Sequence, residues 1–154
     1  MVIVSRGCGK ACRILAEVGV LAFVAGCGAG GTYPVSGWVL LADGRPVRAG
    51  QIEFRSLDRP ISAIGALRPD GSFELSLRAT GDGALAGAYA VALVEPAPPP
   101  GVPSQEAEEA PLAEARREWL ADVPRRYRST ATSGLSFEVK PDRRANAFQI
   151  VLEP

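Results

Sequence analysis

The sequence predicts an all-β fold: a sandwich of about seven short strands, with one short helix in a long insertion and a cleaved N-terminal signal segment. Three observations support this prediction. Apolar residues recur at every second position in short runs, which is the period of a strand with one buried face. The 17 glycines and 13 prolines among 154 residues separate these runs with turns. Helical spacing of apolar residues is concentrated in one stretch, 112–121.

The composition fits one domain and argues against several functions. A chain of 154 residues supplies one good hydrophobic core. Its 17 basic and 17 acidic side chains leave no net charge, so there is no strong basic field to bind nucleic acid. Histidine, the commonest general base and metal ligand, is absent. We therefore expect a protein that is not an enzyme and that holds no metal or cofactor.

Residues 1–26 have the organisation of a signal peptide. Arg6, Lys10 and Arg13 form a basic start, and an apolar stretch of about 13 residues follows over 14–26. A membrane-spanning helix needs roughly 20 apolar residues, so this stretch is too short to be one. We expect the segment to direct export and then to be removed.

The end of this segment resembles the bacterial lipobox, in which small residues precede a cysteine. Val24, Ala25 and Gly26 come directly before Cys27. The resemblance implies cleavage before Cys27 and a diacylglyceryl group on its thiol, with residues 27–34 as a flexible, glycine-rich tether. The other two cysteines lie in the removed segment, so no partner for a disulfide remains. The expected location is the bacterial cell envelope, lipid-anchored at the outer membrane or at the cell surface or periplasmic face.

The strands follow one another along the rest of the chain. They are expected at 33–42, 51–55, 62–67, 73–77, 88–95, 134–140 and 148–152. The turn 68–71 (Arg-Pro-Asp-Gly) combines the fixed φ of proline with a glycine that accepts positive φ, so the flanking runs predict a hairpin. In the first run Trp38 and Leu40 alternate with Val39 and Leu41, and we interpret Trp38 as a core residue.

A long excursion, 96–133, separates the fifth strand from the sixth. It begins with five prolines in eight positions and continues with an acidic cluster at 106–109. Residues 112–121 are rich in good helix formers and predict one short amphipathic helix. Its apolar face is expected to contain Leu112, Ala115, Trp119 and Leu120.

Several turn motifs, in order, resemble the carboxypeptidase regulatory-like domains, which are transthyretin-like (Ig-like) β-sandwiches. They are V-S-G-W-V at 35–39, D-G-R-P-V at 43–47, G-Q-I-E-F at 50–54, P-D-G-S-F at 69–73 and L-A-G-A-Y-A-V at 85–91. The segments V-P-x-x-Y at 123–127 and S-G-L at 133–135 are similar to small planctomycete-type lipoproteins of this kind. The resemblance covers 35–154 and implies a non-catalytic accessory or cell-surface module.

The densest basic patch of the mature chain is the candidate interaction surface. It contains Arg125, Arg126 and Arg128 around Tyr127, with Trp119 nearby on the predicted helix. Two interpretations remain open: contact with lipid headgroups, an anionic glycan or an envelope protein, or a solvated loop beside a buried tyrosine. Trp119 would either stack on a sugar or seal the helix onto the sandwich.

The polar candidates elsewhere have simple structural interpretations. Asp43, Asp70 and Asp82 each precede a glycine, and we interpret them as turn residues rather than calcium ligands, because no D-x-D-x-D-G loop is present. The only lysine of the mature chain, Lys140, is expected to be solvated.

These observations together predict a membrane-anchored envelope lipoprotein whose β-sandwich is a non-catalytic structural or protein-interaction module. The alternative is a carbohydrate- or cell-wall-binding module, which partial exposure of Trp38 or Trp119 would favour. An envelope hydrolase is the third interpretation, and it would need a catalytic carboxylate.

Overall fold

The computed structural model describes residues 31–97 and 110–154. The predicted signal segment, the lipobox, the first half of the tether (27–30) and the acidic cluster of the excursion lie outside these residues. Within them, the chain is an all-β sandwich of nine strands in three sheets with one short α-helix. The predicted fold class is therefore confirmed.

One layer is a three-stranded sheet in which strand β2 (Ser36–Leu41) lies between two neighbours. β5 (Ser72–Glu74) pairs with β2 antiparallel, and β9 (Ala147–Leu152) pairs with it parallel. The first and last long strands of the described chain are thus adjacent.

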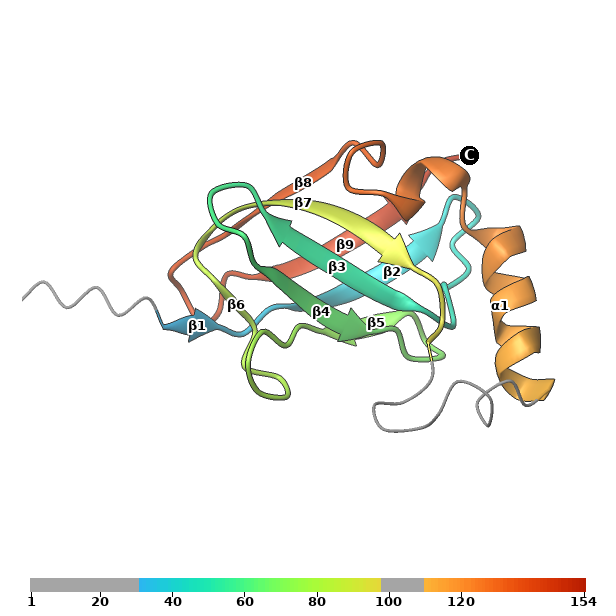
Figure 1. Cartoon of the computed structure of the whole chain (residues 1–154), viewed down its shortest axis with the longest axis horizontal. Coiled ribbons are helices and arrows are strands. Elements are labelled where there is room, and N and C mark those ends of the chain that lie inside the picture. The colour runs from blue at the N-terminus through green and yellow to red at the C-terminus, as the bar shows by residue number, and fades with distance from the viewer. Residues whose placement is uncertain (1–30, 98–109) are drawn as a thin grey trace, which may run out of the picture.

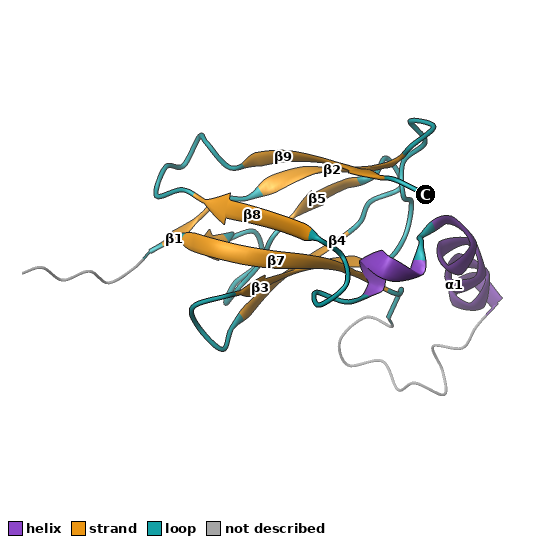
Figure 2. Ribbon diagram, turned by 90° about the horizontal axis from the view of Figure 1, so that it is seen from above, coloured by secondary structure: helices purple, strands orange, loops and turns teal. Residues whose placement is uncertain are grey.

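The second layer is a four-stranded antiparallel sheet. Its order is β4 (Ser62–Ala66), β3 (Gln51–Ser56), β7 (Gly87–Val94) and β8 (Leu135–Val139). Figure 2 shows the two sheets as separate layers, with β9, β2 and β5 on one side and β8, β7 and β3 on the other.

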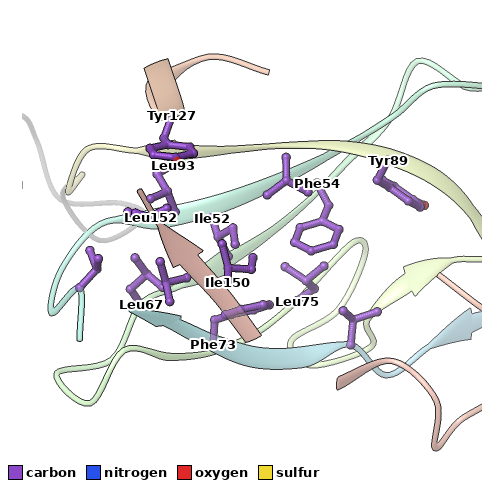
Figure 3. Packing of buried hydrophobic residues seen from close by; sticks show 14 of the residues in the cluster. Ile52, Phe54, Leu67, Phe73, Leu75, Tyr89, Leu93, Tyr127, Ile150 and Leu152 are labelled. Atoms are coloured by element: carbon purple, nitrogen blue, oxygen red, sulfur yellow. The ribbon is translucent and has the colours of Figure 1, made fainter. Parts of the chain in front are cut away.

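The core lies between these layers and is built by alternation. Figure 3 shows Ile52 and Phe54 of β3 packed close to Ile150 and Leu152 of β9. All four residues are at most 2% exposed. Phe54 is at the centre of an aromatic cluster, with ring centroids 6.0–6.2 Å from those of four other rings. Burial of such side chains contributes about 1.5–3 kcal/mol each.

Two further strands were not predicted, because each has only two residues. β1 (Thr32–Tyr33) pairs antiparallel with β6 (Ala84–Leu85) at one end of the sandwich. Runs this short have no readable alternation. The expected count of about seven strands is therefore corrected to nine within the described residues.

The hairpin predicted around the turn 68–71 is also corrected. The turn itself is present: Gly71 has φ +77° and its N–H donates to the carbonyl of Arg68. The strands on either side belong to different sheets, however, since β4 pairs with β3 and β5 pairs with β2. Only an isolated bridge between Ile64 and Ser76 links them. The chain uses this turn to cross from one layer to the other.

The prediction that Trp38 is a core residue is wrong. Val39 and Leu41 are buried, whereas Trp38 is 50% exposed on the outer side of β2. Gly37 lies on the inner side, where an added Cβ would come within 2.9 Å of the Phe73 ring. Apolar residues occupy both sides of this strand, so alternation alone did not decide which side faces the core.

The predicted helix is confirmed as α1 (Ala110–Asp122), and a 3-10 turn, η1 (Arg125–Arg128), follows it. Trp119 and Val123 are buried against the sandwich, but Leu120 is 47% exposed, which corrects its place on the apolar face. The side of the helix that contacts the sandwich is therefore narrow, and Leu120 lies next to that side, facing solvent.

The two ends of the sandwich differ. In Figure 1 the chain enters at β1 on the left, and α1 and η1 lie at the right. The loops 57–61 and 140–146 are at the β1 end, because Leu57 bonds to Ala88 and Val139 pairs with Gly87. No helix in the described part of the chain is long and apolar enough to cross a membrane.

Candidate functional site

Tyr127, at the centre of the predicted basic patch, is buried and holds the excursion to the sandwich. Its hydroxyl accepts a hydrogen bond from Arg126 at 2.6 Å and another from the backbone N–H of Glu153 at 3.0 Å. Arg126 also donates to the Glu153 carbonyl at 3.0 Å. The η1 turn therefore binds the chain directly after β9.

Arg128 also donates hydrogen bonds to backbone carbonyls, and these bonds hold the end of the helix. Its guanidinium donates to the carbonyls of Val123 and Leu120 at 2.6 and 2.8 Å, and lies 5.1 Å from the centre of the Trp119 ring. These carbonyls belong to the end of α1, where free carbonyl groups attract a cation. Arg128 thus acts as a cap for the helix.

Trp119 is not part of the surface. Its side chain is 4% exposed, and an added Cβ on Gly50 would lie 2.6 Å from its indole nitrogen. The structure agrees with the expectation that Trp119 seals the helix onto the sandwich and places it out of reach as a stacking platform. Of the five residues expected on an interaction surface, Arg125 and Arg126 are exposed, and Arg126 has intramolecular partners.

The outer side of the three-stranded sheet is an open surface, here called the Trp38 face. It carries Trp38, Leu40, Ser72, Gln149 and Val151. The register places Trp38 between Ser72 of β5 and Gln149 of β9. Leu40 and Val151 form the next row, and Val151 is 41% exposed. An exposed indole thus lies in the middle of a flat sheet with polar side chains on both flanks.

A shallow groove of about 260 Å³ runs beside Trp38 towards the turn 68–71. Arg68 forms an ion pair with Glu74 at 3.3 Å, and the Asp70 carboxylate accepts hydrogen bonds from the Ser72 hydroxyl and N–H at 2.7 and 2.9 Å. These two bonds lower the pKa of Asp70. The groove therefore presents a fixed carboxylate, a guanidinium and a hydroxyl next to an aromatic ring.

This combination of groups is chemically suited to holding a ligand on the sheet surface. An indole surface packs against the apolar side of a flat ligand, and the neighbouring donors and acceptors fix its orientation. The groove is open, and its volume is below the roughly 300–1,000 Å³ of sites that enclose a small molecule.

A second hollow of about 290 Å³ lies at the α1 end, between the Asp43 turn and the end of the helix. Arg45 lies in its wall and is 2.7 Å from Asp43 and 3.7 Å from Asp122. The side-chain hydrogen bond with Arg45 lowers the pKa of Asp43. Two carboxylates neutralise this guanidinium, so it ties α1 to the β2 turn rather than offering a free charge.

The aspartates before glycines use their carboxylates within their own loops. Asp43 accepts the N–H of Arg45, and Asp82 accepts the N–H of Leu77 at 2.7 Å. Within residues 31–97 and 110–154, no three Asp, Glu or Cys side chains come together in a way that could hold a metal ion.

Sequence reasoning missed the Trp38 face because it placed Trp38 in the core. The polar Ser36 lies two positions before Trp38 and shares its side of the strand, whereas Gly37 shares the side of Val39. A polar residue on the side of Trp38 indicates that this side faces solvent. The groove residues Arg68 and Asp70 had been assigned to the turn alone.

The chain was compared with family models, curated proteins and solved structures, and none of them matches it.

Proposed function

We propose that this chain is a lipid-anchored protein of a bacterial cell envelope, whose non-catalytic β-sandwich is a binding module that presents the Trp38 face. The lipobox-like segment that ends at Cys27 supports the anchor, and the order of turn motifs over 35–154 supports a carboxypeptidase regulatory-like domain. The absence of histidine from the whole sequence supports a role without catalysis.

The half-exposed side chain of Trp38 is the observation that favours a particular class of ligand. Trp38, Leu40 and Val151 lie next to one another on the open side of the sheet, and contiguous exposed apolar patches commonly mark binding surfaces. The polar flanks suit a glycan of the cell wall or envelope, since a sugar ring has an apolar side for the indole and hydroxyls for Arg68, Asp70 and Gln149. A glycan is therefore the ligand that this face fits best.

Intrinsic fluorescence tests this proposal. The Trp119→Phe variant leaves Trp38 as the only indole, and addition of soluble envelope polysaccharide or glycan-strand fragments is expected to shift its emission to the blue. Trp38→Ala is expected to abolish retention of the chain on the insoluble glycan. The matched control is Leu120→Ala, which removes another exposed apolar side chain, on α1 rather than on the three-stranded sheet.

Retention that is unchanged in Trp38→Ala, or no shift with any envelope glycan, would remove the glycan proposal and leave a protein-binding or structural module. Hydrolysis of an ester, amide or glycan substrate that a single carboxylate substitution abolishes would replace the proposal with an envelope hydrolase.

The anchor is tested separately by the mass of the N-terminal peptide of the protein taken from its membrane fraction. A peptide that begins at a diacylated Cys27 is expected. An unmodified chain that begins at Met1 would overturn both the anchor and the envelope location.

A further inference from the structure

We propose that the end of the sandwich at which β1 enters binds the anionic headgroups of the membrane that holds the lipid anchor. The contact is made by the β1-end loops, defined as residues 57–61, 76–83 and 140–146. This inference rests on the lipid anchor proposed above, and it adds a surface that the anchor alone does not require.

Chain length sets how near these loops lie to the bilayer. Four residues lie between Cys27 and Thr32, so the five steps from one to the other span at most about 18 Å at full extension. Thr32 is fixed to the sandwich, because β1 pairs with Leu85 and Ala84 of β6. The anchor therefore holds the β1 end close to the membrane. The basic segment 125–128 lies at the other end, separated by the length of β7, about 26 Å.

The β1-end loops are rich in cations that have no acidic partner. None of the ion pairs in the described residues involves their five basic side chains. Two of their three acidic side chains already accept backbone N–H groups of their own loops. The basic residues are Arg59, Arg78, Lys140, Arg143 and Arg144, and the acidic ones are Asp58, Asp82 and Asp142.

An apolar residue stands among these charges. Leu57 is 61% exposed, the most exposed large hydrophobic side chain in the described chain, and it is followed closely by Arg59. Exposed leucine next to arginine is the combination that binds the interface of an anionic bilayer, where the apolar group enters the headgroup layer and the cations pair with phosphates.

The loop with three of the cations has a fixed shape. Asn146 is 3% exposed, and its side chain bonds to the backbone N–H and carbonyl of Lys140 and to the carbonyl of Asp142 at 2.8–3.0 Å. Its own carbonyl accepts the N–H of Ser36 at the start of β2. The loop is thus fastened to the sandwich, and Lys140, Arg143 and Arg144 are exposed. Such preorganisation lowers the entropy cost of binding a surface.

The test uses the full, lipidated chain in vesicles. Leu57→Cys is labelled with a polarity-sensitive fluorophore, since the Cys27 thiol is acylated and the other cysteines are removed with the signal segment. In vesicles of phosphatidylcholine with phosphatidylglycerol, we expect a blue shift of the label and several-fold weaker quenching by acrylamide, a neutral quencher, than in phosphatidylcholine alone. High salt is expected to reverse both changes, because it screens charge.

The combined charge reversal Lys140→Glu, Arg143→Glu and Arg144→Glu is expected to abolish the difference between the two vesicle types. The matched control reverses three exposed charges at the opposite end, Arg48→Glu, Arg117→Glu and Arg125→Glu, and is expected to keep the difference between the two vesicle types. The lipid and salt comparisons use the unaltered loop cations, so they test the inference even where the charge reversal does not fold.

Equal emission and quenching in both vesicle types, or a shift that neither salt nor charge reversal changes, would overturn the inference. Failure of the anchor has a different signature: the chain would not float with phosphatidylcholine vesicles. Loss of the anionic effect with normal flotation removes this inference and leaves the proposed anchor standing.

Discussion

The Tyr127 hydroxyl accepts a hydrogen bond from the backbone N–H of Glu153 across 3.0 Å, which joins the turn after the helix to the end of β9. Arg126 donates to both the hydroxyl and the Glu153 carbonyl, so three groups close a small ring. The excursion between the fifth and sixth predicted strands is therefore an integral part of the sandwich from α1 onward.

Tyr127→Phe removes the shared acceptor and keeps the buried ring. We expect a loss of about 1 kcal/mol in the free energy of unfolding, because the Glu153 N–H and Arg126 lose one partner each. Urea unfolding followed by circular dichroism measures it. Tyr33→Phe is the control, since none of the described hydrogen bonds involves the Tyr33 hydroxyl. An equal loss in both variants would show that the Glu153 bond contributes nothing specific.

Replacement of the two tryptophans by alanine is expected to lower the free energy of unfolding by different amounts. Trp119→Ala should cost about 3–5 kcal/mol, because it leaves a cavity where a 4% exposed ring joins α1 to β3. Trp38→Ala should cost less than about 1 kcal/mol, because its ring is half exposed. Chemical denaturation of both variants, followed by far-ultraviolet circular dichroism, gives the comparison. A larger cost for Trp38 would contradict the orientation of β2.

Gly50→Ala should detach the helix. Gly50 has φ +102°, and an added Cβ would lie 2.6 Å from the Trp119 indole nitrogen and 2.7 Å from the Val94 carbonyl. Gly44→Ala is the matched control, since Gly44 also has positive φ but nothing lies within 4 Å of its added Cβ. We expect about 1–2 kcal/mol for Gly44, the cost of the backbone conformation alone, and clearly more for Gly50. Trp119 emission should shift to the red only in Gly50→Ala.

Asn146→Ala should release the loop 140–146. The substitution removes three hydrogen bonds of a buried amide and leaves the Lys140 N–H without its side-chain acceptor, so we expect a loss of about 1–3 kcal/mol. Trypsin should then cleave after Arg143 or Arg144 many times faster than in the parent chain. Ser136→Ala, on the exposed side of β8, serves as the control. Unchanged cleavage would mean that Asn146 does not hold the loop.

The Asp70 turn should give a pH-dependent contribution to stability. Hydrogen bonds from Ser72 lower the folded-state pKa of Asp70 below 3.8, its ordinary value. A carboxylate with a lowered pKa stabilises the fold above that ordinary value, and the contribution is lost as the pH falls through the folded-state pKa. Asp70→Asn should therefore unfold at lower urea than the parent chain at neutral pH. The difference in urea midpoint between the two proteins should narrow below pH 3.8. A difference that does not change with pH would contradict a lowered pKa for Asp70.

Much of the fold could be predicted because strand alternation and turn chemistry are local. Phe73 and Leu75, or Leu135 and Val139, mark their strands by period two, and Gly71 marks its turn. The orientation of β2 could not be predicted from period, since Trp38 and Val39 are both apolar and only packing against Phe73 and Phe148 selects the buried side.

The sheet assignment of β5 depends on contacts far apart in sequence. The turn 68–71 suits a hairpin equally well, but Phe73 pairs with Gly37 instead. The same limit applies to the candidate site, because the Trp38 face and its groove combine three strands and a turn. No local pattern brings Trp38, Asp70 and Gln149 together.

The parallel pairing of β2 with β9 has a consequence for the order of folding. Gly37 and Phe148 are partners although they are about 110 positions apart, and contacts of such long range slow folding because a large loop must close first. Until β9 has been synthesised, β2 has β5 alone as a neighbour and its other edge stays open. The three-stranded sheet therefore cannot be completed until nearly all of the described chain has been synthesised.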